Sequence, residues 1–337
     1  MKISEIKPGS TGTTEVVVLD VTEGKVSKGR MKGSAFLTVS ISDGETKTSV
    51  KIFDTDKESF GYKVGDVIFI ELTAQEYNES ITYLGKKETI ARSSAPLENF
   101  VISAPVAPKA LFDALIGMAR KECGVYQPLV EKLLMDNKEK LLVWGAAKAM
   151  HHAIRGGLLY HTYSVARLAY MRGHEANNYP SILGRVVVVD VPLLVSGAIL
   201  HDIGKLRELN TIETGDSEYT PEGSLLGHLY IGCEMIVVAN LSLPAEKRVP
   251  EDKMLLLKHL ILAHHGKLEY GSPVLPQTIE AEILHEADES DAKLYEFCDA
   301  MKPLKDGELG DKAFALGTRT FRAPGAFPEK AKPARTE

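Results

Sequence analysis

A histidine and an aspartate stand side by side where an apolar run ends, in residues 198–205. The imidazole nitrogen of His201 and the carboxylate of Asp202 are ligands that suit a divalent metal ion. Lys205, about one turn further along, could pair with a phosphate group as a point charge. The pair can also be structural, with the histidine bonded to a backbone carbonyl group and the aspartate capping a turn. Other residues of the chain have to decide between these interpretations.

More histidines follow the same pattern after residue 156. Seven of the ten histidines lie in or beside apolar segments there: His161, His201, His228, His259, His264, His265 and His285. A buried polar group costs several kcal/mol unless it is paired, and a shared metal ion would pair many of them at once. Each histidine taken singly is more often a satisfied core residue. The series as a whole, with Asp288 in the segment 283–293, favours a metal centre.

The elements that must position these residues are of two kinds, and the first kind is strands. Residues 11–92 contain β-branched or alternating apolar runs, and Asp43-Gly44 is a turn signal between two of them. Five strands with a long break before Val67 indicate a small Greek-key barrel, most simply an OB-fold, although another five-stranded sandwich would also fit. The expected strands are 15–21, 35–42, 46–53, 67–72 and 81–84.

A basic loop follows the first expected strand. Such barrels bind single strands through basic loops and exposed aromatic rings. The candidate nucleic-acid contacts are Lys25, Lys28, Arg30 and Lys32 in the loop, with Phe36 and Phe53 on the strands beside it. The alternative is a solvated loop of lysines beside two core phenylalanines.

The second kind of element is helical. From Lys109 onward, apolar residues recur at helical spacing, and glycine and proline separate the segments. We therefore expect a multidomain chain whose N-terminal β-barrel is followed by an all-α domain. The expected boundaries are a barrel domain at 1–95, a linker rich in proline, serine and alanine at 96–108, the helical domain at 109–302, and a tail at 303–337 that is partly disordered, from about Ala323 on.

Composition limits the classes of function. A chain of 337 residues is long for one core, and its net charge of −6 provides no overall basic field, so nucleic-acid binding must rest on a local patch or a metal-lined channel. Three widely spaced cysteines form neither a disulfide framework nor a zinc knuckle, as is typical of a reducing cytoplasm. The N-terminus lacks an apolar signal-peptide core, and the run at 186–189 is too short to span a bilayer. We expect a cytoplasmic protein without a membrane partner.

The metal-ligand candidates resemble the motif of the HD-domain metal-dependent phosphohydrolases. His161, the adjacent His201 and Asp202, and Asp288 match that motif in order. The resemblance implies that these four residues coordinate one divalent metal ion. His228 and the pair His264-His265 resemble the ligands of members with a second ion, which Asp202 would bridge. Residues 266–273 lack the Gly-Tyr-Pro signature of the HD-GYP phosphodiesterases, which argues against a cyclic-dinucleotide phosphodiesterase.

A closer resemblance covers nearly the whole chain. The order of the barrel and the motif blocks is similar to that of the YhaM family of bacterial 3′–5′ exoribonucleases, with blocks at 156–162, 201–205, 225–232, 264–274 and 280–288. This resemblance implies hydrolysis of single-stranded RNA, with single-stranded DNA as a second candidate, to 5′-mononucleotides. It also implies two ions per site, with manganese favoured and iron, cobalt, nickel or zinc as alternatives. Two ions could hold the attacking water and the scissile phosphate together.

Several residues have roles that the sequence leaves open. Lys205 is the candidate phosphate contact and catalytic residue beside Asp202, or else a cation at a helix end. Asp291 and His285 could orient the ligands through hydrogen bonds, or Asp291 could cap a helix or face solvent. His151, His152 and Arg155 could line the substrate path or belong to the core or surface.

Two other functions remain open. One is a phosphohydrolase of small nucleotides, in which the barrel serves only as an oligomerisation module. A homo-oligomer is compatible with this function and with the exoribonuclease. The other is a nucleic-acid-binding protein with a structural metal, which would show salt-dependent affinity but no product.

Overall fold

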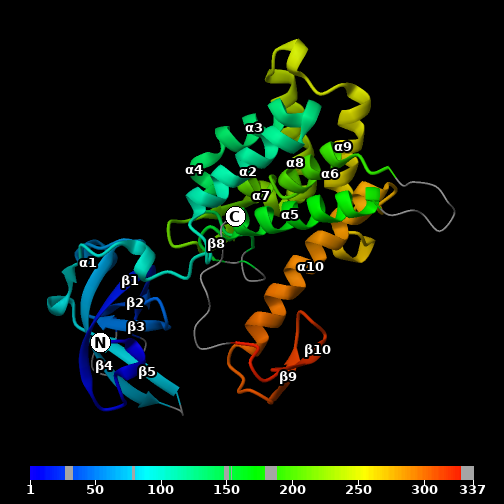
Figure 1. The fold of residues 1–337 in the computed structure, drawn as a ribbon. Coiled ribbons are helices and arrows are strands. Elements are labelled where there is room, and N and C mark those ends of the chain that lie inside the picture. Colours follow the sequence, from blue (N-terminus) through cyan, green and yellow to red (C-terminus); the bar gives the residue numbers. More distant parts are fainter. Residues whose placement is uncertain (27–32, 78–79, 148–151, 153, 179–187, 328–337) are drawn as a thin grey trace. The chain divides into compact units, whose positions relative to one another are not determined.

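The computed structural model describes residues 1–26, 33–77, 80–147, 152, 154–178 and 188–327 (Figure 1). The chain divides into two compact units. The first contains Met1–Ser103 together with Thr211–Asp216, and the second contains Ala104–Asn210 together with Ser217–Glu337. Each unit is described separately below.

The first unit is a closed barrel. Its strands are β1 (Thr11–Lys25), β2 (Ala35–Ser42), β3 (Lys47–Phe53), β4 (Val67–Tyr77), β5 (Ser80–Gly85) and the short β6 (Ala91–Arg92), with η1 (Ile3–Glu5), α1 (Lys57–Phe60) and η2 (Lys87–Thr89) between or before them. The strand order is β1-β2-β3-β5-β4, and β4 pairs back onto β1, which closes the sheet. β3 and β5 are parallel, and the other pairs of this ring are antiparallel. The predicted OB-like barrel is confirmed.

Alternation along the strands fills the barrel. Leu37, Val39 and Ile41 of β2 are fully buried, as are Val50 and Ile52 of β3. Side chains of a strand point alternately to its two faces, so every second residue enters the interior. A bulge between Val18 and Asp20 lets the long strand β1 pair with β4 in its first half and with β2 in its second.

The segment after the barrel packs more closely than the expected linker would. The barrel domain was expected to end at residue 95 and a linker to cover 96–108, but the first unit extends to Ser103. After η3 (Leu97–Asn99), Phe100 and Val101 are buried against Val17 and Val67. These two adjacent apolar residues explain the difference, because burying them removes apolar surface from water.

The second unit is a helical bundle. It contains α2 (Pro108–Glu122), η4 (Gly124–Tyr126), α3 (Gln127–Asp136), α4 (Lys138–Leu141), α5 (Gly157–Asn178), α6 (Val191–Leu200), α7 (Lys205–Glu208), the hairpin β7 (Leu209–Thr211) and β8 (Ser217–Tyr219), α8 (Pro221–Ser242), η5 (Ala245–Lys247), α9 (Glu251–Ala263), η6 (Leu268–Tyr270) and α10 (Ile279–Met301). The predicted all-α domain is confirmed, with the small β7–β8 hairpin as an addition.

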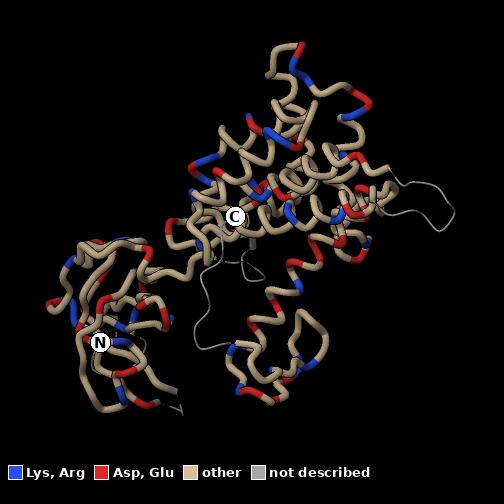
Figure 2. The backbone as a smooth tube through the Cα atoms, in the orientation of Figure 1, with Lys and Arg blue, Asp and Glu red and all other residues tan. Residues whose placement is uncertain are grey.

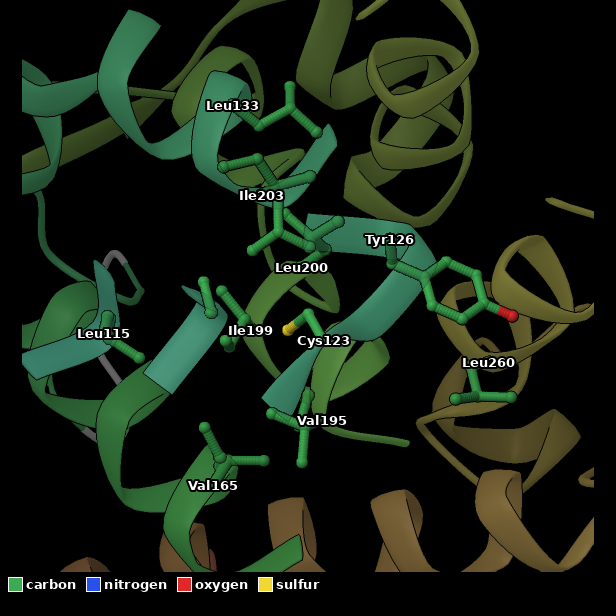
Figure 3. Packing of buried hydrophobic residues seen from close by; sticks show 14 of the residues in the cluster. Leu115, Cys123, Tyr126, Leu133, Val165, Val195, Ile199, Leu200, Ile203 and Leu260 are labelled. Carbon is green, nitrogen blue, oxygen red and sulfur yellow. The ribbon is translucent and has the colours of Figure 1, made fainter. Parts of the chain in front are cut away.

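Helix α6 lies at the centre of this bundle. It begins at Asp190, whose carboxylate accepts a hydrogen bond from the amide of Leu193. Nearly all its residues are buried, and α2, α3, α5, α9 and α10 all contact it. Figure 3 shows Val195 and Ile199 among side chains contributed by the neighbouring helices. A helix that is apolar all round belongs in a core, so its C-terminal end carries His201 and Asp202 into the interior.

The C-terminal tail contains a hairpin that the sequence analysis did not predict, before the part from about Ala323 that it expects to be disordered. Strands β9 (Leu309–Ala313) and β10 (Thr318–Phe321) form an antiparallel hairpin that contacts α10. Residues 328–337 lie outside the described residues. Residues 303–322 are mostly polar and contain glycine, so hydrophobic periodicity does not indicate these strands.

Among the described helices, α8 alone is long and apolar enough to cross a membrane by length and composition. This is weak evidence, because core helices of soluble proteins pass the same test. The expected absence of a membrane partner therefore stays a prediction.

Candidate metal centre

The predicted ligands come from separate helices that meet at one point. His161 lies in the first turns of α5, and Asp288 lies in α10. His201 is the residue that ends α6, and His264 ends α9. His228 lies in α8, after Gly227, which interrupts the helix with a φ of 71°. The pairs α5–α6, α6–α9, α8–α9 and α10–α5 are all in contact, and this packing brings residues distant in sequence together.

The first group of ligand atoms surrounds His161. Its Nε2 lies 3.2 Å from Nε2 of His201 and 3.1 Å from Oδ1 of Asp288. Oδ2 of Asp202 lies 3.5 Å from Nε2 of His161 and 3.3 Å from Nε2 of His201. These side chains are nearly or fully buried, except that Asp288 retains 17% exposure of its side chain. Nitrogen and oxygen ligands therefore converge in a dry pocket.

The second group lies on the other side of Asp202. Nε2 of His228 lies 3.2 Å from Nε2 of His265 and 3.5 Å from Oδ1 of Asp202. Nε2 of His264 lies 3.8 Å from the same oxygen. The two carboxylate oxygens of Asp202 thus face different histidine groups, as a bridging ligand would.

The imidazole rings of the candidate ligands share one orientation, with Nε2 toward the centre and Nδ1 away from it. Nδ1 of His201 faces the carbonyl oxygen of Ala198 and Nδ1 of His264 faces that of Ile261, both at 2.8 Å. A carbonyl oxygen can only accept, so in the neutral ring the proton is on Nδ1 and the lone pair is on Nε2. His161, His228 and His265 likewise direct Nδ1 away from the centre. The Nε2 nitrogens therefore face the centre, where they can act as ligands.

Two buried atoms show that the pocket suits a cation. Oδ1 of Asp202 and Nε2 of His264 are buried and have no hydrogen-bond partner among the described residues. Buried polar atoms are normally paired. Burial, and then its neighbours His201 and His265, lower the pKa of His264 well below the ordinary value, so it stays neutral. A neutral imidazole and a carboxylate oxygen without donors fit a divalent metal ion.

The buried carboxylates of the pocket favour positive charge on the groups beside them. Although burial opposes it, the hydrogen bonds of Asp288 and Asp291 raise the pKa of His161 to about 9. Burial also raises the pKa of Asp202, but the nearby Lys205 and His201 outweigh it and hold this pKa well below the ordinary value. The pocket thus attracts a proton when no stronger cation competes for the same atoms.

Asp291 and His285 lie behind the inward-facing rings. Oδ2 of Asp291 lies 2.8 Å from Nδ1 of His161 and 2.9 Å from Nε2 of His152, so it orients His161. Nδ1 of His285 lies 3.0 Å from the carbonyl oxygen of His264. His259 accepts a hydrogen bond from the amide of Gln277, away from the centre. His151 lies outside the described residues.

Comparisons with known proteins agree with this geometry. Residues 158–293 match the model of the HD domain family. The chain is 32% identical over 320 residues to "3′-5′ exoribonuclease YhaM" of Oceanobacillus iheyensis, which covers 92% of each protein. It is 33% and 32% identical over 303 residues to the proteins of the same name from Bacillus velezensis and Bacillus subtilis, with 87% of this chain and 89% of each relative covered. The chain belongs to the YhaM family. The predicted family is confirmed, and an HD domain of this family implies a divalent metal.

Lys205 has a defined place in this YhaM-family centre. Its ammonium lies 2.8 Å from Oδ2 of Asp202, and the residue is 9% exposed. Burial alone would lower the pKa of Lys205, but the charge of Asp202 raises it, so the side chain remains a cation. The predicted phosphate contact stays a prediction, and the alternative of a cation that only faces helix carbonyl groups does not account for the bond to Asp202.

The sequence analysis missed Glu208. Oε1 of this buried residue accepts from both the backbone amide and Nδ1 of His228, each at 3.0 Å. The break at Gly227 turns the amide of His228 toward that carboxylate. Glu208 is the last residue of the short helix α7, which begins at Lys205, and it belongs to none of the motif blocks. The glycine directly before a candidate ligand was the available signal.

Three of the candidate nucleic-acid contacts on the barrel lie outside the described residues, namely Lys28, Arg30 and Lys32. Lys25 is exposed at the end of β1. The rings of Phe36 and Phe53 lie 5.7 Å apart, and Phe53 is 41% exposed. Lys51, which the sequence analysis did not select, lies 5.9 Å from the centre of the Phe36 ring. Figure 2 shows basic and acidic residues interspersed along the chain, so a binding surface here is local.

Proposed function

We propose that this chain is a metal-dependent 3′–5′ exoribonuclease that hydrolyses single-stranded RNA to 5′-mononucleotides. The observation that carries the proposal is the set of inward-facing imidazole nitrogens on both sides of Asp202. Membership of the YhaM family supports both the reaction class and the RNA substrate.

We assign two ions to this centre. The ligands of the first are His161, His201, Asp202 and Asp288. The ligands of the second are His228, His264 and His265, with Asp202 shared. Both groups contain sets of ligand atoms within 4.8 Å of one another, which supports the assignment. Manganese is our first candidate, and iron, cobalt, nickel or zinc would also accept these ligands.

The ions would supply charge neutralisation of the phosphate and activation of the attacking water. The protein's own residues prepare the site. Asp291 holds the ring of His161, and Glu208 holds the ring of His228, so that both Nε2 atoms face inward. Lys205 forms an ion pair with Oδ2 of Asp202, and its ammonium carries three hydrogens. We propose that Lys205 donates one of them to a phosphate oxygen of the substrate.

The barrel would contribute affinity for the strand. The half-exposed ring of Phe53 beside Phe36, with Lys51 of β3 over the Phe36 ring, offers stacking and charge without base-specific contacts. We propose single-stranded RNA as the ligand of this surface, with single-stranded DNA as a weaker one.

Cys123, Cys233 and Cys298 are unpaired, which supports our proposal of a cytoplasmic protein.

A nuclease assay tests the proposal. Purified protein with Mn²⁺ should shorten a 5′-labelled single-stranded RNA from its 3′ end and release 5′-mononucleotides, and a matched DNA strand should react more slowly. The double variant His201→Ala with Asp202→Ala should be inactive. Intact RNA with rapid hydrolysis of free nucleotides would identify a small-molecule phosphohydrolase instead. Salt-dependent RNA binding without product would identify a binding protein with a structural metal.

A further inference from the structure

The turn that follows His264 and His265 is tightly constrained. Gly266 has a φ of 73°, and any side chain there would overlap the ring of His285. Oγ of Ser272 lies 2.8 Å from the carbonyl oxygens of Leu262 and Val274. The segment between these anchors, residues 267–271, therefore has a defined position beside the candidate metal centre.

Tyr270 links this turn to the centre through its backbone. Its carbonyl oxygen accepts the hydrogen bond from Nδ1 of His265 at 2.9 Å, so this residue sets the orientation of a candidate ligand. The side chain of Tyr270, in contrast to its carbonyl group, is not buried in the turn, because the residue is 52% exposed. An exposed aromatic ring thus belongs to the residue that holds His265, on the side of that imidazole opposite its inward Nε2.

Cationic side chains accompany the ring. The ammonium of Lys267 lies 4.9 Å from the centre of the Tyr270 ring. Lys293 of α10 pairs with Glu289 at 2.7 Å. The hydrogen bond from Lys293, and more weakly the charge of Lys267, lower the pKa of Glu289, so these groups lie close together. Glu269 of the same turn and Glu289 of α10 carry the opposite charge, so the positive charge available here is local to Lys267, beside the ring.

We propose that Tyr270 and Lys267 form a binding subsite for the nucleoside next to the scissile phosphate. The ring stacks on the base, and the ammonium pairs with an adjacent phosphate. Stacking accepts every base, because each has a π-face, and so suits an enzyme that must remove successive nucleotides of any sequence. This inference rests on the proposed exoribonuclease function and adds a substrate contact to it.

Substitution of the ring combined with removal of the base tests this subsite. Tyr270→Leu keeps the carbonyl group that holds His265 but removes the π-face. On normal RNA we expect KM to rise about 5- to 150-fold, as base–aromatic stacking predicts, with kcat changed less than about twofold. Tyr270→Phe should behave like the wild type. Tyr219→Leu, which replaces an equally exposed tyrosine (54%), is the matched control and should leave KM unchanged.

RNA strands that lack the base of the last or of the next-to-last nucleotide identify the partner of the ring. On one of these two strands, wild type and Tyr270→Leu should have the same KM. Lys267→Gln should reduce the dependence of log KM on log salt concentration by about one unit. The metal content of each variant, measured by plasma mass spectrometry, should equal that of the wild type.

Three results would overturn the subsite. One is an unchanged KM in Tyr270→Leu, while the wild type degrades RNA normally. Another is an equal loss on normal and both base-free strands. The third is a loss of bound metal, which would mean that Tyr270 acts only through His265. Failure of the wild type to degrade any RNA would refute the proposed function itself, and is distinguishable from all three.

Discussion

The rings of His201 and His264 obtain their orientation from the ends of their own helices. Each directly follows the last residue of its helix, α6 or α9, and each donates from Nδ1 to the carbonyl oxygen three residues earlier. The last carbonyl groups of a helix lack intrahelical partners, so the imidazole satisfies one of them. The same bond directs Nε2 inward. A structural hydrogen bond and a metal ligand are therefore compatible uses of one histidine, and they are not alternatives as the sequence alone suggested.

His228 receives its orientation from a side chain instead. We expect Glu208→Gln to weaken binding of the proposed second ion about 10- to 100-fold, because the charged acceptor on Nδ1 of His228 is lost. Titration of metal-free protein with Mn²⁺ by calorimetry would measure this change. The variant Glu222→Gln, on the exposed partner of Arg207, is the control and should keep the wild-type affinity. An unchanged affinity in Glu208→Gln would show that His228 is not a ligand.

Close packing of α6 against α9 places the His201 and His264 rings 4.9 Å apart. Gly197 permits that approach, because a Cβ atom at this position would overlap Leu260. We expect Gly197→Ala to reduce the free energy of unfolding by about 1–3 kcal/mol through overpacking, and to weaken metal binding as the helices separate. Urea denaturation of the metal-free protein would measure the stability change.

A second glycine provides the matched control for that substitution. Gly117 also lies inside a helix, α2, but has no atom within 4 Å of the position of a Cβ. Gly117→Ala should raise the free energy of unfolding by about 0.5–1 kcal/mol, because alanine favours the helix. If both variants were stabilised equally, the close approach at Gly197 would have no role in positioning the centre.

The long periodic elements could be predicted from the sequence, and the short ones could not. Alternation in β2 and β3 predicts strands with one buried face, and the apolar run of α6, interrupted by Ser196, predicts a buried element. The hairpins β7–β8 and β9–β10 have three to five residues per strand, which is too few for a period to appear. The role of Glu208 could not be predicted either, because its partner His228 is distant in sequence and only tertiary packing brings the two together.

All the candidate metal ligands belong to the second unit, and the barrel's candidate strand-binding residues, Phe36, Lys51 and Phe53, belong to the first. We therefore expect Lys51→Gln with Phe53→Ser to raise KM for a long RNA about tenfold or more, through loss of stacking and charge. Cleavage of a dinucleotide, which has no further nucleotides for the barrel to bind, should stay within about twofold. Steady-state assays on the two substrates make the comparison. An equal loss on both would mean that these residues affect the protein's folding instead of the binding of the strand.

Proton release couples the metal centre to the stability of the protein. The pKa of His161 is about 9 instead of its ordinary 6.5. In the metal-free protein its protonated form contributes stability that is fully present below pH 6.5 and lost as the pH rises through 9. A metal ion must displace this proton below pH 9. From this residue alone, affinity should be about a hundredfold higher at pH 8 than at pH 6.

The melting temperature reports this coupling, because a ligand that binds only the native state stabilises it according to its affinity. We expect a fixed concentration of Mn²⁺ to raise the melting temperature several degrees more at pH 8 than at pH 6, and chelation to remove the difference. Asp291→Asn removes one of the two carboxylates that hold the proton on His161, so its pH dependence should be shallower. An equal Mn²⁺ effect at both pH values would mean that the ion does not displace the proton of His161, and would remove this residue from the proposed ligand set.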